Sequence, residues 1–575
     1  MRIKFHGANS RVTGSCIELQ DAELDVHFLV DCGSTQEPNE DPSFPFDPRS
    51  LDCVLLTHAH IDHCGRLPLL AKQGFRGKIY CTKATEELAR LSLADAALLP
   101  NTAFGADEVA LLDSLWAQPH GQVMATGNRL ATDVTFRFDR AAHILGSVWL
   151  TVPWKKDGRL NQILFSGDLG PSEEDELDGN GAEPFLMRSR FSPHWPNGKN
   201  ALRYAVLEST YGGRERRLLS PDDRRAALRA QLREVVGRGG QLLIPTFSID
   251  RLQNLIIDLS IIYANEPELF EQVPVFLDAP LGQRVNQVYA KHLLATELWN
   301  QNSQRFEKHV KMLWMSRELS RSLGLDEMDA AAVALAQDLL DIALLEEPGD
   351  SVARLAASSH HWANSWRRVW QPAPAQLRQP AVIITGGGMC EGGKVLQHLP
   401  RVLRDERSRV LLTGYSAKGS NARRLLNLPA ELASRRLLGP EYAVLDIPPS
   451  ELRAQIEQFS AYSAHADQAS LLRWAFPNRA HKEYGPSRWT AAERFFLNHG
   501  EPDAREALKQ ALLARGAELQ GVDGCGPVPE VELPHDSSPW FQLDLARWED
   551  DSPELAELEA CERRCAELRA KLGRR

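Results

Sequence analysis

Residues 57–63 read THAHIDH and place four zinc-binding side chain types, His58, His60, Asp62 and His63, within six residues. Imidazole and carboxylate groups are the usual protein ligands of zinc, and burying so many of them without a metal would be costly. The run follows an apolar stretch, Cys53 to Thr57, that we expect to be a strand. Side chains in a loop at the end of a strand can face opposite sides, so the run predicts a site for two metal ions.

Three more residues that could take part end or follow expected strands. Asp31 ends the stretch Val26 to Asp31, His143 lies in AAHILGS, and Asp168 lies in FSGDLG. Each is weak support alone, because a polar residue at the end of a strand is common. Beside a histidine cluster, Asp31 is expected to orient an imidazole N–H from outside the ligand set, and His143 and Asp168 are expected to be ligands.

The elements that must position these residues fall into two groups. The first part of the chain reads as short strands and one helix, which suggests an α/β sandwich: Cys16–Leu19, Val26–Asp31, Cys53–Thr57, Lys78–Cys81, Ala84–Leu99 (helix), Val134–Phe138, Ser147–Pro153, Gln162–Ser166 and Ala205–Glu208. From about Ser220, helices alternate with fully apolar strands, as in a parallel sheet: Pro221–Gly237 (helix), Gln241–Pro245, Arg251–Tyr263 (helix), Val273–Asp278, Ala381–Thr385 and Val410–Thr413. We expect this to be a second, inserted domain.

Composition limits the class of protein. A chain of 575 residues with 43% hydrophobic and 25% charged residues suits a globular enzyme of two or more domains. The net charge of −11 argues against a broad nucleic-acid surface and allows only local contacts. The nine cysteines form no CxxC pair, which argues against a disulfide framework and a cysteine zinc ribbon. No signal peptide or apolar run of membrane-spanning length is present, so we expect a cytoplasmic protein without membrane contact.

Asp31, the HxHxDH run, His143 and Asp168 resemble, in order, the four motifs of the metallo-β-lactamase-fold hydrolases. The resemblance implies an αββα sandwich that binds two Zn²⁺ per chain. It implies that the first metal is held by His58, His60, His143 and Asp168. The second would be held by Asp62, His63 and Asp168, with one more ligand to be found.

Later motifs resemble the β-CASP branch of that superfamily, which cuts nucleic acids. They are Leu207–Gly212 (motif A, with Glu208 as the acid), Ile244–Arg251, Phe276–Pro280, Gly388–Gly393 followed by His398 (motif B), Gly414–Ser420, Ser463–Asp467 (motif C) and His499–Pro502. The resemblance covers about residues 1–510. It implies a sandwich in two parts, 1–211 and 398–510, an inserted β-CASP α/β domain at 212–397, and a C-terminal extension at 511–575. An extra helical insertion is expected at about 326–370.

The resemblance also implies roles for single residues. His465 of motif C would be the missing ligand of the second metal, and a histidine there resembles the RNA-cutting members, ribonuclease J and the polyadenylation-site endonucleases. DNA-repair members usually carry Val there, so RNA is favoured over DNA. The expected catalytic residues are Asp62, His398 and Glu208. Asp62 would be a ligand of the metal that activates water. His398 would protonate the leaving oxygen, and Glu208 would orient the imidazole ring of His398.

Three basic residues, Arg251, Lys418 and Arg423, are candidates for holding the RNA backbone, although each could equally be a surface charge. A narrow cleft in an acidic protein suits single-stranded RNA better than duplex. The family implies products with 3′-hydroxyl and 5′-phosphate ends, and a homodimer is an expectation from the same source.

Three other functions are compatible with these motifs. A two-zinc hydrolase of a small ester or lactam would not need the inserted domain as a second wall. A DNA nuclease of the same superfamily and a non-catalytic β-CASP scaffold subunit also fit the pattern. Scaffold subunits usually lose metal ligands, whereas every ligand position is filled here. Two departures from the family are Arg216, where a His is frequent, and the insertion of about 45 residues from Asp326. The tail beyond about Gly521 does not resemble the usual C-terminal domain of ribonuclease J, so that subtype is not assigned.

Overall fold

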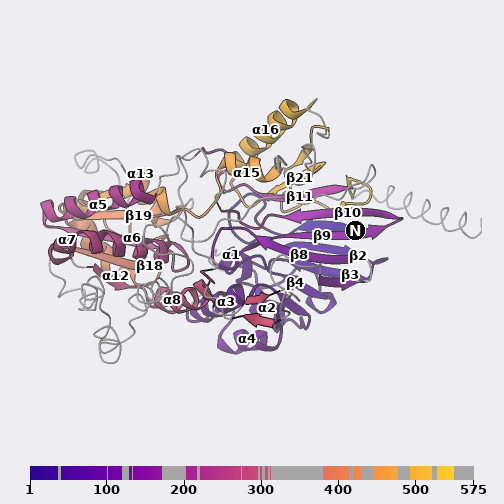
Figure 1. The fold of residues 1–575 in the computed structure, drawn as a ribbon, viewed down its shortest axis with the longest axis horizontal. Coiled ribbons are helices and arrows are strands. Elements are labelled where there is room, and N and C mark those ends of the chain that lie inside the picture. The colour runs from indigo at the N-terminus through magenta and orange to yellow at the C-terminus, as the bar shows by residue number, and fades with distance from the viewer. Residues whose placement is uncertain are drawn as a thin grey trace, which may run out of the picture.

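The computed structural model describes most of the chain. The described residues are 1–35, 40–99, 102–118, 128–131, 134–170, 202–215, 221–273, 275–295, 298–300, 305–307, 311–312, 380–414, 416, 419–428, 444–476, 492–520 and 527–549. The expected insertion at 326–370, Arg216, Lys418 and the last part of the tail, 550–575, lie outside them. Figure 1 shows two bodies side by side, a strand-rich one at the right and a helix-covered sheet at the left.

The strand-rich body is a sandwich of two sheets. One sheet has the order β24-β23-β1-β2-β3-β4-β5-β6, and the other has the order β22-β21-β11-β10-β9-β8-β7. The strands of the first are β1 Arg2–Phe5, β2 Ile17–Asp21, β3 Val26–Val30, β4 Cys53–Leu55, β5 Lys78–Tyr80, β6 Trp116–Ala117, β23 Phe541–Gln542 and β24 Arg547–Trp548. Those of the second are β7 Asn128–Ala131, β8 Val134–Arg140, β9 Val148–Lys156, β10 Arg159–Phe165, β11 Arg203–Glu208, β21 Arg494–Asn498 and β22 Glu530–Glu532.

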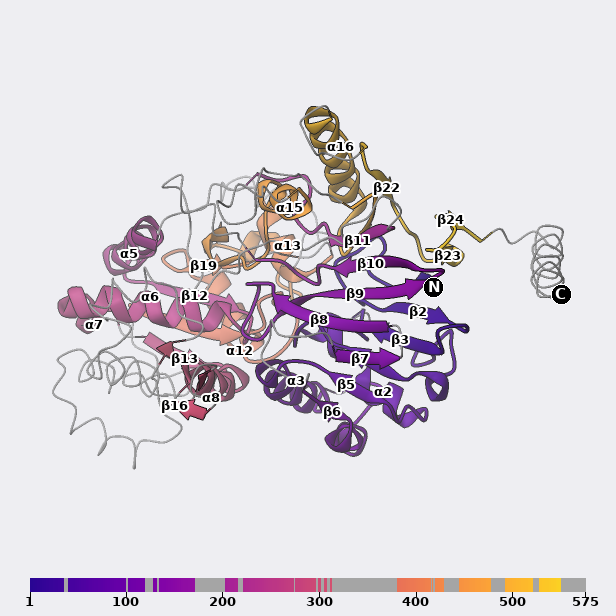
Figure 2. The same ribbon diagram turned by 45° about the vertical axis from the view of Figure 1, so that its right-hand side comes forward.

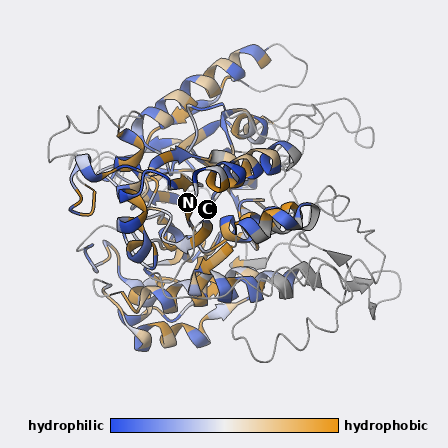
Figure 3. Cartoon of the chain, turned by 90° about the vertical axis from the view of Figure 1, so that its left-hand side faces the viewer, coloured by the Kyte–Doolittle hydropathy of each residue, from blue (hydrophilic) through white to orange (hydrophobic). Residues whose placement is uncertain are grey.

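Helices cover both outer faces of this sandwich. On the first sheet lie α2 Leu67–Lys72, α3 Lys83–Ala96 and α4 Ala106–Ala110, and on the second lie α15 Gln468–Ala475 and α16 Pro502–Leu519 (Figure 2). A third apolar cluster, which includes Phe28, Phe136 and Trp154, fills the space between the sheets. A helix that packs on a sheet carries hydrophobic residues towards the sheet and hydrophilic residues towards solvent. Figure 3 shows hydrophobic and hydrophilic residues mixed along the helices. The layers are therefore αββα, as the sequence predicts.

The second body is a five-stranded sheet with the order β13-β18-β12-β19-β20, in which every neighbouring pair is parallel. Its strands are β12 Gln241–Thr246, β13 Val275–Asp278, β18 Ala381–Gly386, β19 Arg409–Leu412 and β20 Gln455–Gln458. Its helices are α5 Pro221–Arg238, α6 Arg251–Asn265, α7 Pro267–Gln272, α8 Pro280–Leu293, α12 Val395–Arg404 and α13 Asn421–Asn427. Apolar clusters on both faces explain why these strands are continuous apolar runs.

The inserted unit ends later than the expected boundary at 398. Strands β19 and β20 belong to the parallel sheet, so the chain returns to the sandwich only after Gln458. An apolar strand pattern shows burial but does not say which sheet the strand joins. The tail expected as a separate extension is partly built into the sandwich, because β22 and the β23–β24 hairpin extend its two sheets.

The two bodies contact each other along α3 and α8. Arg284 of α8 pairs with Asp95 of α3 at 3.1 Å, and His292 pairs with Glu87 at 3.0 Å. The hydroxyl of Tyr289 accepts a hydrogen bond of 3.4 Å from the backbone N–H of Leu145. Among the described helices, none is long and apolar enough to cross a bilayer.

Candidate metal centre

The THAHIDH run follows strand β4, and its last three residues belong to the short helix α1, Ile61–Cys64, on the side of the sandwich that faces the inserted unit (Figure 1). Asp31 fixes its start, because its carboxylate accepts hydrogen bonds from the Thr57 backbone N–H at 2.8 Å and the Thr57 hydroxyl at 3.0 Å. Gly33 lets the run pack closely, since a Cβ at this position would lie 1.7 Å from the carbonyl oxygen of Asp62. The loop therefore presents its histidines from a fixed backbone.

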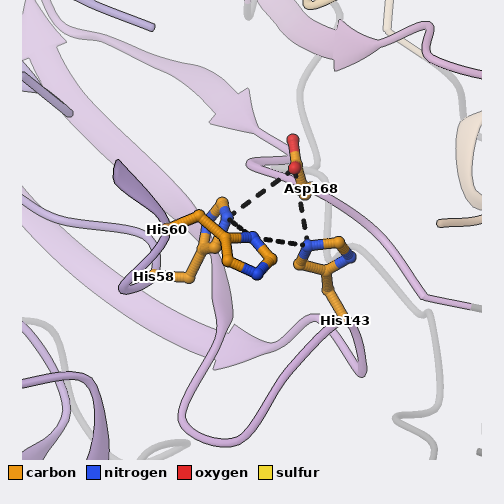
Figure 4. A group of neighbouring side chains, drawn as sticks. All are labelled: His58, His60, His143 and Asp168. Atoms are coloured by element: carbon orange, nitrogen blue, oxygen red, sulfur yellow. Dashed lines mark hydrogen bonds and ion pairs between the residues drawn. The ribbon is translucent and has the colours of Figure 1, made fainter. Parts of the chain in front are cut away.

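Four side chains form a first group of ligand atoms, as expected from the sequence (Figure 4). Nδ1 of His60 lies 3.0 Å from Nε2 of His58 and 3.2 Å from Nε2 of His143. Oδ2 of Asp168 lies 3.6 Å from Nε2 of His58 and 3.5 Å from Nε2 of His143. A tetrahedral zinc ion with Zn–N bonds of about 2.0–2.1 Å has ligands about 3.3 Å apart. These four atoms have that spacing.

A second group contains Asp62, His63 and His499. Nε2 of His499 lies 3.2 Å from Nε2 of His63 and 3.4 Å from Oδ2 of Asp62. His499 directly follows strand β21 and has a φ of 53°, an uncommon left-handed backbone conformation that turns the chain towards the centre. In the structure His499, rather than the expected His465, completes the group of Asp62 and His63.

Asp168 lies between the two groups. Its Oδ2 faces the first group, while its Oδ1 lies 3.4 Å from Nε2 of His63 and 3.3 Å from Nδ1 of His499. Oδ1 is buried and makes no hydrogen bond of good geometry within the described part of the chain. A buried carboxylate oxygen without a hydrogen bond is costly unless a cation satisfies it. The residues present therefore fit metal binding on either side of Asp168.

Four of the histidines are also held through the second ring nitrogen, whereas Nε2 of His60 is buried without a hydrogen-bond partner among the described residues. Nδ1 of His63 lies 2.7 Å from Oδ2 of Asp31, and Nδ1 of His143 lies 3.1 Å from the carbonyl oxygen of Ala464. The hydroxyls of Thr57 and Thr210 lie 3.1 Å from Nδ1 of His58 and His499, respectively. Such partners select the tautomer that presents the other nitrogen to a metal. Asp31 lies beside His63, and its role in orienting that ring stays a prediction.

The electrostatics of the two groups differ. Burial lowers the pKa of His58 and His143 well below the usual value and that of His60 to about 4, so these rings are neutral, as ligation requires. Burial would also lower the pKa of His63 and His499, but the nearby carboxylates together outweigh it: Asp168 and Asp31 raise the pKa of His63, and Asp168 and Asp62 raise that of His499. This half of the site attracts positive charge, which a divalent cation would supply in place of protons.

The expected role of His465 as the remaining ligand of the second metal differs from the geometry. His465 is absent from the Asp62 group and instead faces Glu208, with Nδ1 3.3 Å from Oε2. Oε1 of Glu208 accepts a hydrogen bond of 2.7 Å from the Leu169 backbone N–H, which fixes the carboxylate beside Asp168. Asp168, Glu208 and His465 form a third group of possible ligand atoms, in which Nδ1 of His465 lies 3.9 Å from Oδ2 of Asp168.

The expected pairing of His398 with Glu208 is likewise not found. His398 is buried in α12 of the inserted unit, and its Nε2 lies 2.8 Å from Oδ2 of Asp278 at the end of β13. The Gly388–Gly393 loop resembles a catalytic motif in sequence, but the helix after it turns His398 towards its own sheet. The geometry therefore moves the acid–histidine pair from Glu208 and His398 to Glu208 and His465.

Arg251, one of the expected phosphate contacts, lies close to the first ligand group. Its positive charge lowers the pKa of His60 and His143, and its guanidinium carbon lies 4.5 Å from the centre of the Phe247 ring. Arg423 donates from Nε to the carbonyl oxygen of Ser416 at 2.9 Å, so part of its guanidinium holds the loop before α13. Lys418 is outside the described residues.

Comparison with known proteins gives three family matches along the chain. Residues 13–130 match the metallo-β-lactamase superfamily, and residues 252–425 match the β-CASP domain. Residues 450–520 match a domain described as the RNA specificity domain of zinc-dependent metallo-hydrolases. The last match contains both His465 and His499.

Similar proteins extend over most of the chain. Ribonuclease TTHA0252 of Thermus thermophilus is 28% identical over 524 residues, which are 90% of this chain and 97% of that protein. An RNase J-like protein of Methanocaldococcus jannaschii is 24% identical, covering 82% of this chain and 88% of its own. Cleavage and polyadenylation specificity factor 73 of Drosophila melanogaster is 23% identical, covering 89% of this chain and 61% of its own. The predicted fold class is confirmed by the family matches.

Proposed function

Because the chain belongs to the β-CASP family of metallo-β-lactamase-fold hydrolases, we propose that it is a zinc-dependent ribonuclease that hydrolyses phosphodiester bonds of single-stranded RNA. The observation that carries the proposal is the pair of ligand groups on either side of Asp168, with the His465–Glu208 pair beside them. The second wall provided by the inserted unit suits a polymer better than a small ester or lactam.

The chain's own residues would hold two Zn²⁺, one in each group, with Asp168 between them. When bound, such ions neutralise phosphate charge and lower the pKa of water. The bond between phosphorus and the ribose 3′ oxygen would break, and water oxygen would join phosphorus. The products would then carry 3′-hydroxyl and 5′-phosphate ends.

His465 would supply the proton that the departing 3′ oxygen needs. Nδ1 of His465 faces the Glu208 carboxylate, so the proton on Nε2 is the one available to the leaving group. Glu208 keeps a proton on Nδ1 and would stabilise the charged imidazolium, which carries the second proton on Nε2. Arg251, which lies close enough to influence His60 and His143, would hold a phosphate at the centre.

The preference for RNA rests on the family match at residues 450–520 and on relatives named as ribonucleases. The preference for single strands rests on the net charge of −11, which disfavours a broad grip on duplex. A cytoplasmic location and a homodimer stay predictions.

The test is incubation of zinc-loaded protein with end-labelled RNA and DNA of matched sequence, single-stranded and duplex. We expect cleavage of single-stranded RNA, and its loss in the double variant Asp62→Ala, His63→Ala. The control double variant Asp107→Ala, His535→Ala changes the same residue types at positions far from the metal centre in sequence and should cleave normally. Cleavage of DNA alone would instead support a DNA nuclease of the same superfamily, and cleavage retained by the Asp62, His63 variant would refute the proposed centre.

A further inference from the structure

Two segments connect the sandwich to the inserted unit, and one buried side chain contacts residues of both. The outgoing segment leads from β11 into α5, whose first turns carry Arg224, and the returning segment after β20 carries Tyr462. The carboxylate of Asp258, in α6, accepts hydrogen bonds from both Arg224 and Tyr462. Its Oδ2 accepts from Nε of Arg224 at 2.5 Å and from the Tyr462 hydroxyl at 2.8 Å, and its Oδ1 accepts from a terminal nitrogen of Arg224 at 3.0 Å.

These three side chains are shielded from water. Asp258 is 0%, Tyr462 is 4% and Arg224 is 6% exposed. The Arg224 guanidinium also lies 5.4 Å from the centre of the Tyr462 ring. Burial raises the pKa of Tyr462, so its hydroxyl keeps the proton that it donates. A buried ion pair is a weak source of stability, because desolvation offsets its attraction, so such a pair with specific geometry points to a positioning role.

Tyr462 begins the loop that contains His465, only three residues later. Further contacts on the sandwich side hold the same loop: the Ser463 hydroxyl lies 3.0 Å from the Tyr211 hydroxyl, and the Ala464 carbonyl lies 3.1 Å from Nδ1 of His143. The Ala466 backbone N–H donates to the carbonyl of Leu169, next to Asp168, at 2.6 Å. The loop is thus fixed to the sandwich after Tyr462 and to the inserted unit at Tyr462.

We propose that the Arg224–Asp258–Tyr462 network is a positioning device that sets the place of His465 relative to the bond being cleaved. Tyr462 transmits the position of α6 to the loop, and Arg224 fixes α6 to α5, the helix that follows the outgoing segment. The inference rests on the proposed function, because it assigns His465 to protonation of the leaving oxygen. It adds that residues of the inserted unit, without touching the substrate, govern that step.

Tyr462→Phe is the most selective perturbation. It removes one hydroxyl and keeps the ring, while both Asp258 oxygens retain hydrogen bonds from Arg224, so no buried charge is left alone. The matched control is Tyr204→Phe. Tyr204 is also buried, at 2% exposed, and its hydroxyl donates to the carbonyl of Leu543 at 2.5 Å, away from the metal centre.

The readout compares two substrates that differ in their need for a proton. The ribose oxygen of RNA is a poor leaving group without protonation, whereas the nitrophenolate of bis(p-nitrophenyl) phosphate leaves without it. Displacing a catalytic group by about 1 Å costs up to about 100-fold in rate. We therefore expect Tyr462→Phe to lower kcat on RNA by about 10- to 100-fold with KM unchanged, and to leave hydrolysis of bis(p-nitrophenyl) phosphate as in the wild type.

His465→Ala is measured beside it and should show the same selectivity, with a larger loss on RNA of about 10²- to 10⁴-fold. If His465→Ala is selective but Tyr462→Phe slows both substrates equally or neither, the positioning role is wrong while the proposed function stands. If His465→Ala shows no selectivity, the proposed role of His465 fails first. If Tyr462→Phe does not fold, Arg224→Lys, which keeps the charge and loses the two-pronged contact, takes its place with the same expected result.

Discussion

Replacing Asp31 with Asn should weaken the second metal site selectively. Asp31 is 2% exposed, and its carboxylate accepts from Nδ1 of His63 at 2.7 Å and from two groups of Thr57 at 2.8 and 3.0 Å. Its φ is 62°, a left-handed conformation that Asn also adopts readily. The substitution therefore changes hydrogen bonding while it preserves size and backbone conformation.

The size of the effect follows from the number of acceptors. A carboxylate offers two acceptor oxygens, whereas the Asn amide offers one and puts an N–H₂ donor in place of the other. If the donor faces His63, Nδ1 must accept, and the proton moves to the Nε2 that should bind the metal. Loss of such an outer partner costs about 10- to 100-fold in metal affinity, or about 1.4–2.7 kcal/mol.

The assay is titration of metal-free protein with zinc in competition with a chromophoric chelator. Wild-type protein should bind two equivalents, and Asp31→Asn should bind one normally and one about 10- to 100-fold more weakly. RNA cleavage should recover at excess zinc. Asp25→Asn is the control, because Asp25 is exposed and has a φ of 52°. Unchanged affinity at both sites, or an equal loss at both, would refute this reasoning.

Three further variants test other parts of the account. Burial alone would raise the pKa of Glu18, but hydrogen bonds from two histidines outweigh it and lower that pKa to about 2. Glu18 thus stabilises the fold above the unfolded-state pKa of 4.5, and this stabilisation is lost as the pH falls towards 2. In denaturant unfolding, the wild type should therefore be more stable than Glu18→Gln at pH 6, and this difference should shrink by about 2 kcal/mol between pH 6 and pH 3. His398→Ala should retain RNA cleavage within about tenfold, well short of the loss expected for a general acid, and a loss of about 10²-fold or more would restore it as a candidate. Gly33→Ala should lower the free energy of unfolding by about 1–3 kcal/mol, because the new Cβ meets the Asp62 backbone, and an unchanged unfolding midpoint would contradict that packing.

Local sequence patterns were enough to predict much of the fold and the members of the first ligand group. The strands that lead to Asp31, His58 and Asp168 are short apolar runs, and the structure places β3, β4 and β10 at those positions. Ligands that follow such strands can be predicted because each side chain is tied to a strand end. This explains why the group of His58, His60, His143 and Asp168 comes together as expected.

The remaining histidines could not be assigned in the same way. His398, His465 and His499 each lie in or follow a recognisable motif, and nothing local says which of them reaches the second metal. That choice depends on where long connections return the chain, and the return lies after Gln458 rather than at the expected 398. Once β19 and β20 join the parallel sheet, His398 stays in the inserted unit beside Asp278, while His465 and His499 come to the centre.

The proposed two-zinc centre is tested most directly by an anomalous-difference map from crystals of the zinc-loaded protein, recorded on both sides of the zinc absorption edge. Two peaks a few ångströms apart, with Asp168 between them, are expected. The first peak should be surrounded by His58, His60 and His143, and the second by Asp62, His63 and His499. A single peak, or a second peak bound by His465 in place of His499, would contradict the proposed centre.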